Sequence, residues 1–234
     1  MIRAYIFDLD DTLMPEEAFI ESGFRHVAGW LGERYGRADF YPLLMELYEE
    51  NPAYVFNRLL DRLGIAYTKS TVSELVRQFR QHTPDVSFYE DVVPFLQELK
   101  ESGMKTGIIT DGYAVSQRNK LTVLGAEELV DVVVVTYELG REFWKPHPRA
   151  FELMRSRLGV AYEEMVYIGD NVQKDFVTPN RLGMQTVRIF RPKGVYHEKN
   201  FGYPSEYYAS MSIHSLFELK KWLPEAPLRV EGTR

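Results

Sequence analysis

Short apolar runs rich in β-branched residues recur along the chain, and after Glu90 they alternate with segments of helical spacing. Runs of this length, bounded by turn residues, predict strands buried inside a protein. The run Val132–Val135 consists only of valine, which is typical of a strand buried on both faces. The expected strands are Ile2–Phe7, Thr106–Thr110, Val132–Thr136, Met165–Ile168 and Thr186–Ile189.

The helical segments lie between these predicted strands, and Asp91 is a candidate N-cap for the first of them. The repeated alternation predicts right-handed crossover connections, and therefore an α/β fold with a doubly wound, mainly parallel sheet. Ligands of such sheets bind at the carboxyl ends of the strands. The expected helices are Asp91–Ser102, Ala114–Leu124, Pro148–Leu158 and Val172–Leu182.

The long stretch between the first two predicted strands carries helical spacing instead of a strand pattern. Loops of this length are rare in compact domains, so the stretch is expected to form a structure of its own. Thr71 and Glu74 have the spacing of a capping box. We therefore predict an all-helical insertion over residues 15–88, set into a core of residues 1–14 and 89–234. The apolar residues with helical spacing include Ile20, Phe24, Val27, Leu31, Phe56, Leu60 and Leu63.

The C-terminal part is expected to be less regular. Arg191–Tyr208 is rich in aromatic residues, glycine and proline, which predicts a long surface connection. A last strand and a helix around Leu216–Leu223 would follow it, and the tail Pro224–Arg234 is expected to be frayed.

Composition excludes several classes of function. The chain has 28 Lys and Arg against 34 Asp and Glu, a net charge of -6, which argues against a nucleic-acid partner. It has no cysteine, which excludes thiolate catalysis, zinc-thiolate sites and iron–sulfur clusters. No apolar run is long enough to span a membrane, and the N-terminal residues lack the pattern of a signal peptide. We therefore expect a cytoplasmic protein with no membrane partner.

Three carboxylates crowd together where the first predicted strand ends, in Asp8-Leu9-Asp10-Asp11-Thr12. Packing does not explain them, and at the end of a strand Asp8 would project into the crevice at the carboxyl edge of the sheet. Other strand ends and a loop carry complementary groups. Each has an ordinary explanation alone, as a cap or a solvated charge, but together they predict a single site. These groups are Thr110-Asp111, Lys145, Gly169-Asp170 and Asp175.

This ordered set resembles the four motifs of the haloacid dehalogenase-like hydrolase superfamily. In that family an Asp-x-Asp-x-Thr follows the first strand, a Thr or Ser the second, then a Lys, and then Gly-Asp with a further acid. The resemblance implies a Rossmann-like core with a helical type 1 cap, and it points to the phosphatase branch. Asp11 stands where many relatives have glycine, and we interpret it as a turn residue.

The resemblance also implies roles for these residues. Asp8 would be the nucleophile that forms an aspartyl-phosphate, which divides a very slow hydrolysis into two easier steps. Asp10 would be the general acid and then the general base. Thr110, Lys145 and backbone groups of Leu9, Asp10 and Asp111 would hold the phosphoryl oxygens.

The crowded carboxylates suit a hard, oxygen-seeking cation such as Mg²⁺. The resemblance assigns metal contacts to Asp8, to the backbone carbonyl of Asp10 and to Asp170, with Asp175 supporting the metal or Lys145. The net negative charge at first disfavours an anionic substrate, but a bound cation would invert the local electrostatics. A small phosphorylated metabolite is therefore the expected substrate.

Alternatives on the same scaffold are a phosphomutase and a 2-haloacid dehalogenase. Asp10 weighs against the dehalogenase, because a halide leaving group needs no proton. A non-catalytic, phosphate-accepting module is a further alternative, although such modules are shorter and have no cap. His147 is interpreted as a surface or helix-start residue. The candidates for substrate contacts, near the entrance of the cap, are Met14, Glu16, Phe19 and Phe24.

Overall fold

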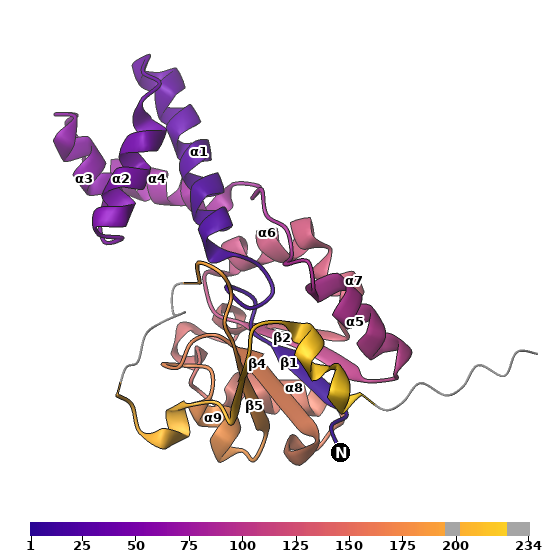
Figure 1. Ribbon diagram of the computed structural model, residues 1–234. Helices are drawn as coiled ribbons and strands as arrows, with labels where there is room; N and C mark the ends of the chain where they lie inside the picture. Colours follow the sequence, from indigo (N-terminus) through magenta and orange to yellow (C-terminus); the bar gives the residue numbers. More distant parts are fainter. Residues whose placement is uncertain (195–201, 224–234) are drawn as a thin grey trace, which may run out of the picture.

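The computed structural model describes residues 1–194 and 202–223. In these residues one sheet of six parallel strands has the order β3-β2-β1-β4-β5-β6 (Figure 1). From β1 at the centre, β2 and β3 follow on one side of the sheet, and β4, β5 and β6 follow on the other. The predicted doubly wound α/β fold is therefore confirmed. The strands are β1 (Ala4–Phe7), β2 (Lys105–Thr110), β3 (Val132–Val135), β4 (Met165–Gly169), β5 (Gln185–Ile189) and β6 (Met211–Ile213).

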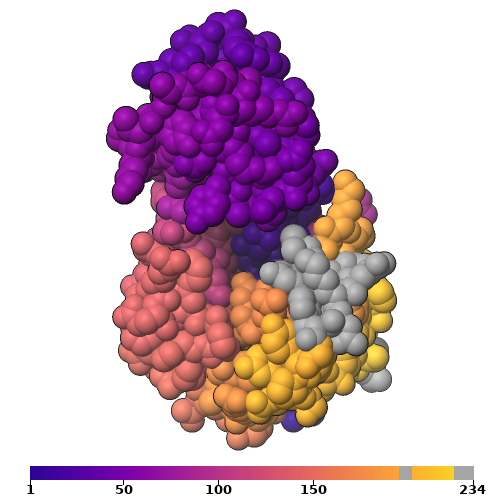
Figure 2. Space-filling model, turned by 90° about the vertical axis from the view of Figure 1, so that its left-hand side faces the viewer, coloured from indigo at the N-terminus to yellow at the C-terminus, as the bar shows by residue number. Residues whose placement is uncertain are grey.

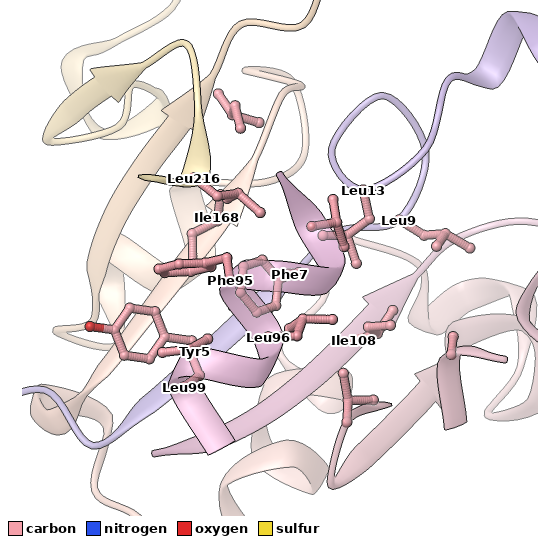
Figure 3. Close-up of a cluster of buried hydrophobic side chains, with 14 of the residues drawn as sticks. Tyr5, Phe7, Leu9, Leu13, Phe95, Leu96, Leu99, Ile108, Ile168 and Leu216 are labelled. Atoms are coloured by element: carbon pink, nitrogen blue, oxygen red, sulfur yellow. The ribbon is translucent and has the colours of Figure 1, made fainter. Parts of the chain in front are cut away.

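Alternate residues of β1 point to opposite faces of the sheet, as the pleat of a strand requires. Tyr5 and Phe7 belong to one buried cluster, and Ala4 and Ile6 belong to the other. Both faces are therefore covered, which explains why the strands read as continuous apolar runs. Figure 3 shows part of the first cluster, with Tyr5, Phe7 and Ile108 of the strands packed against Phe95, Leu96 and Leu99.

Helices on each face supply the other half of these clusters. The segments α5 (Val92–Glu101), α6 (Ala114–Leu124), α7 (Ala126–Leu129) and the 3₁₀ helix Leu216–Trp222 contribute to the first cluster. The helix α8 (Arg149–Leu158) contributes to the second, and the short helix α9 (Val177–Arg181) lies next to β5. Both faces of the sheet are therefore covered by helices of the core.

Four helices follow the first strand and stand beyond the carboxyl edge of the sheet, drawn in indigo to purple in Figure 1. They are α1 (Glu16–Tyr35), α2 (Phe40–Glu50), α3 (Val55–Arg62) and α4 (Lys69–Gln81). They pack around a hydrophobic cluster of their own, in which Phe24, Leu44, Leu59 and Leu75 are buried. Figure 2 shows a hollow between this helical group and the core below it.

Three local predictions need correction. The helix α4 begins earlier than expected, because Thr68 is its N-cap and forms the capping box with Thr71, in place of Thr71 with Glu74. The valine strand β3 lies at the edge of the sheet, so Val132 and Val133 are only half-buried. Asp91 precedes α5 as predicted, but its side chain does not cap that helix.

The expected helix Val172–Leu182 is reduced to the short α9. Side chains in the segment before it hold the backbone in turns, since Asn171 N donates to Asp175 Oδ2 at 2.9 Å and Gln173 N donates to Asn171 Oδ1 at 2.9 Å. Local hydrogen bonds of this kind compete with helix formation.

The C-terminal part follows the prediction where it is described. The last strand is β6, and the expected helix is a 3₁₀ helix over Leu216–Trp222. Part of the expected connection Arg191–Tyr208 and all of the tail Pro224–Arg234 lie outside the described residues. None of the helices in the described residues is long and apolar enough to cross a membrane.

Candidate active site

Asp8 directly follows β1, at the place where the strand order reverses between β1 and β4. Its N–H donates to Ile168 O at 2.9 Å, which continues the pairing with β4 by one residue. The chain then turns sharply, with Leu13 N donating to Leu9 O at 2.8 Å. Asp11 adopts a left-handed φ of 51°, which glycine and Asp tolerate better than most residues, and it accepts a hydrogen bond from Glu16 N at 2.9 Å. Asp11 therefore supports the turn and the start of α1.

Lys145 lies between two buried carboxylates. Its Nζ is 2.6 Å from Asp8 Oδ1 and 2.7 Å from Asp175 Oδ1, and it also donates to Tyr167 Oη at 2.9 Å. Burial opposes the charged form of Lys145, but Asp175 and Asp8 outweigh it and raise the pKa of the ammonium. Burial likewise opposes the charged form of Asp8, but Lys145 and Lys174 outweigh it and lower the pKa of this carboxyl. The pair is therefore ionised.

The acids beside this pair can hold a cation. Carboxylate oxygens of Asp8, Asp170 and Asp175 all lie within 4.8 Å of one another. Asp8 Oδ2 is buried and has no hydrogen-bond partner among the described residues. Burial, followed by the charges of Asp175 and Asp8, raises the pKa of Asp170 well above its ordinary value. An all-oxygen site with an unpaired buried oxygen, in which crowded carboxyl groups oppose the ionisation of Asp170, fits a hard divalent cation that would supply positive charge.

The two oxygens of Asp175 are already used, in contrast with Asp8 Oδ2. Oδ1 accepts from Lys145, and Oδ2 accepts from Asn171 N at 2.9 Å. These contacts favour a role for Asp175 in holding Lys145 and the neighbouring loop. Asp170 is the better candidate for a metal ligand.

Thr110 and Asp111, at the end of β2, lie near the same centre. The buried Thr110 hydroxyl accepts a hydrogen bond from the Gln117 side chain. Asp111 Oδ1 accepts from Thr136 Oγ1 at 2.7 Å and from Lys145 N at 3.1 Å, so it anchors the loop that carries Lys145. Leu9 is fully buried in the core, so its side chain does not line the site.

Three side chains that contact this centre were not predicted from the sequence. Lys120 and Gln117 of α6 donate to the two oxygens of Asp10, at 2.7 and 3.0 Å. Lys174 Nζ lies 3.6 Å from Asp111 Oδ2. Lys174 precedes Asp175 and was close to a recognised motif, but no spacing in the sequence connects α6 with Asp10.

A family model for haloacid dehalogenase-like hydrolases matches residues 5–189, most of the chain and all four motifs. The chain belongs to the haloacid dehalogenase-like hydrolase family. The resemblance predicted from the motifs is thereby confirmed.

Curated relatives of this hydrolase are named phosphatases. It is 37% identical over 204 residues to the glyceraldehyde 3-phosphate phosphatase of Methanopyrus kandleri, covering 82% of this chain and 86% of the relative. It is 32% identical to the protein of the same name from Methanocaldococcus jannaschii, covering 94% and 96%. It is 30% identical to the pyrophosphatase PpaX of Bacillus cereus, covering 80% and 83%.

Solved structures show the same fold. A HAD phosphatase from Thermococcus onnurineus has a TM-score of 0.60 and 27% identity, with 95% of this hydrolase and 98% of that chain covered. A HAD family hydrolase from Deinococcus radiodurans, solved with bound phosphate and sodium, has a TM-score of 0.66 and 23% identity, with 96% of each chain covered.

A cavity of about 410 Å³ opens at the carboxyl edge of the sheet of this hydrolase. The Lys145–Asp8 pair is part of its lining. Its lining includes Asp8, Asp10, Glu16, Asp111, Trp144, Lys145, Asp170 and Lys174. Thr110 is not part of this lining, because Gln117 covers its hydroxyl.

Of the four candidates for substrate contacts, Glu16, Phe19 and Phe24 line cavities. Glu16 and Phe19 line a second cavity of about 290 Å³ next to Asp10, and Phe24 lines one of about 560 Å³ between the helices. Met14 is fully buried in the core, so its expected substrate contact is not supported. Burial and the charge of Asp10 raise the pKa of Glu16 to about 7.

His147 lies at the start of α8 in the hydrolase. Its Nδ1 accepts a hydrogen bond from Arg149 N at 3.1 Å. This agrees with the predicted helix-start role.

Proposed function

We propose that this hydrolase is a phosphatase that releases inorganic phosphate from a small phosphomonoester through an aspartyl-phosphate on Asp8. One observation carries the proposal. Asp8 is buried and ionised beside Lys145, one of its oxygens has no hydrogen-bond partner among the described residues, and it lines a polar cavity. The phosphatase names of relatives up to 37% identical support the same activity.

In the first step, a carboxylate oxygen of Asp8 attacks the phosphorus, and the bond from phosphorus to the leaving oxygen breaks. Lys145 lies against the same carboxylate and would compensate the negative charge of the phosphoryl oxygens. Asp10, which lines the same cavity, would take up a proton from solvent before the step and give it to the leaving oxygen, so that a neutral alcohol departs.

In the second step, Asp10 would take a proton from a water molecule as that water attacks the phosphorus. The bond between phosphorus and the Asp8 oxygen breaks, which releases inorganic phosphate and restores the Asp8 carboxylate. Both steps use Asp8 and Asp10. Once Asp10 has given its proton to the leaving oxygen, it can accept one from water in the second step.

We further propose Mg²⁺ as the cofactor, held by Asp8, by the backbone carbonyl of Asp10 and by Asp170, with Asp175 in support. The bound ion would neutralise the charge between the carboxylates and a dianionic phosphate. The oxygen-only donor set and the unpaired Asp8 Oδ2 support this assignment.

We propose that residues 15–88 form a cap over a catalytic core of residues 1–14 and 89–234, and that the reaction takes place in the cytoplasm. The cap helices place Glu16 and Phe19 beside Asp10. Two relatives are named glyceraldehyde 3-phosphate phosphatase, so a triose phosphate is the first candidate, and a cavity of about 410 Å³ has room for it.

The test is steady-state release of phosphate with Mg²⁺ from p-nitrophenyl phosphate, glyceraldehyde 3-phosphate, glycerol phosphate, a hexose phosphate and pyrophosphate. We expect turnover of an alkyl phosphate, and we expect Asp8→Asn to lose it while keeping the fold by circular dichroism. Wild-type activity in Asp8→Asn would refute the proposal. Isomerised hexose phosphate without free phosphate would favour a phosphomutase, and halide release from a 2-haloacid would favour a dehalogenase.

A further inference from the structure

The carboxylate of Asp10 is held by helix α6. Lys120 Nζ donates to Oδ1 at 2.7 Å, and Gln117 Nε2 donates to Oδ2 at 3.0 Å. The Lys120 side chain is 4% exposed and that of Asp10 is 18% exposed. A buried ammonium paired with one carboxylate is uncommon on a helix that carries no recognised motif. The proposed mechanism leaves this group without a role.

These two contacts fix the orientation of Asp10 without blocking it. A carboxylate oxygen has two lone pairs, so one donor on each oxygen leaves one acceptor position on each. Because donors hold both oxygens, the side chain cannot rotate without losing an ion pair or a hydrogen bond. Asp10 at the same time lines the cavity that contains Asp8.

The same helix also contacts the cap. Ser116 Oγ donates to Arg80 O at 3.3 Å, and Asn119 Nδ2 donates to His82 O at 2.9 Å, where α4 ends. Lys120 Nζ lies 4.1 Å from the ring centroid of Phe19 on α1. One turn of α6 therefore contacts Asp10 and the first and last helices of the cap.

We propose that Lys120 is a positioning residue, which holds Asp10 in place for proton transfer and makes this placement depend on the docked cap. The inference rests on the proposed function, because it takes Asp10 as the general acid. The cap contact with Phe19 and the core contact with Asp10 share one ammonium group. The proton donor would then be in place when the cap lies against α6.

Substrates with leaving groups of different basicity distinguish a misplaced Asp10 from a general loss of activity. A p-nitrophenolate departs with little help from an acid, whereas an alkoxide needs the proton. Because kcat/KM reports on the steps up to loss of the leaving group, a misplaced Asp10 should lower kcat/KM more for an alkyl phosphate than for p-nitrophenyl phosphate.

The variants are Lys120→Met, which keeps the length of the side chain, and Lys120→Arg, which keeps the charge. We expect Lys120→Met to lower kcat/KM for the best alkyl phosphate of the panel at least about tenfold more than for p-nitrophenyl phosphate. Lys120→Arg should recover much of this difference. Arg118→Met is the matched control, because Arg118 lies on the same helix and pairs with the exposed Glu138 at 2.7 Å.

Equal losses on both substrates, or no loss in Lys120→Met, would overturn the positioning role. Asp8→Asn in the same panel separates the two proposals. If Asp8→Asn retains turnover, the proposed function fails. If Asp8→Asn is inactive and Lys120→Met shows no dependence on the leaving group, only the inference about Lys120 fails.

Discussion

The ammonium nitrogen of Lys145 lies 2.6 Å from Oδ1 of Asp8, and neither side chain is more than 2% exposed. Removal of two charges from water is costly, and the mutual attraction of the ions and the contacts to Asp175 and Tyr167 offset that cost. Apolar residues of the same size often pack at no greater cost, so the burial of this pair supports a chemical role better than a stabilising one. The ionised, partly unpaired carboxylate of Asp8 is the direct result.

Lys145→Met is expected to destabilise the fold in the absence of metal. It leaves Asp8 and Asp175 buried without their shared counter-charge, and breaking a buried pair costs about 3–5 kcal/mol. Urea unfolding in EDTA measures the loss. The control is Lys193→Met, since Lys193 pairs with Glu17 at 3.4 Å with both side chains exposed, and its loss should stay within about 0.5 kcal/mol. An unchanged unfolding midpoint in Lys145→Met would contradict this view of the cluster.

Divalent cation should stabilise the folded protein through Asp170. A ligand that binds only the folded state at one hundred times its Kd adds about 2.7 kcal/mol. We expect Mg²⁺ to raise the melting temperature of the wild type, and we expect Asp170→Asn to remove the increase. Asp61→Asn, which changes an exposed acid on α3, should keep it. An equal increase in all three proteins would show that the cation acts elsewhere.

Glu16 should make stability depend on pH near neutrality. Its pKa rises from the ordinary 4.5 to about 7, because of burial and the charges of Asp10 and Asp11, against the opposing charges of Lys120 and Lys174. The folded state therefore binds more protons than the unfolded state between these values. The resulting stabilisation is complete below 4.5 and is lost as the pH rises through 7.

Glu16→Gln removes this titration. Relative to the wild type, the variant should gain stability on the order of 1 kcal/mol between about pH 5 and pH 8, after allowance for solvent screening at a half-buried site. Urea unfolding at both pH values in EDTA provides the measurement. Glu33→Gln, at an exposed position of the same helix, should follow the wild type. Parallel pH profiles for wild type and Glu16→Gln would show that Glu16 titrates normally.

The sheet and the central residues of the site could be predicted because they follow from local pattern. Apolar runs mark buried strands, and parallel strands place their carboxyl ends at one edge, so residues as distant as Asp8 and Asp170 converge. The position of β3 at the edge of the sheet could not be predicted in this way. Four valines have the same pattern in a central strand and in an edge strand, and only the pairing order distinguishes them.

The contacts of Asp10 with α6 also could not be predicted from the sequence. Lys120 is 110 residues from Asp10, and a lysine on a helix is normally solvated. Its burial follows from the way α6 packs between the core and the cap. The Thr68 cap was missed for a more local reason, since Thr71 also contributes a side-chain hydrogen bond to the same capping box.

The central claim is that Asp8 carries the phosphoryl group. The most direct measurement is to quench the enzyme in acid during turnover, reduce any acyl phosphate with borohydride, and locate the modified residue by peptide mass spectrometry. We predict that residue 8 is converted from aspartate to homoserine only when substrate is present. Conversion of a different residue, such as Asp10 or Asp170, with residue 8 intact would contradict the claim.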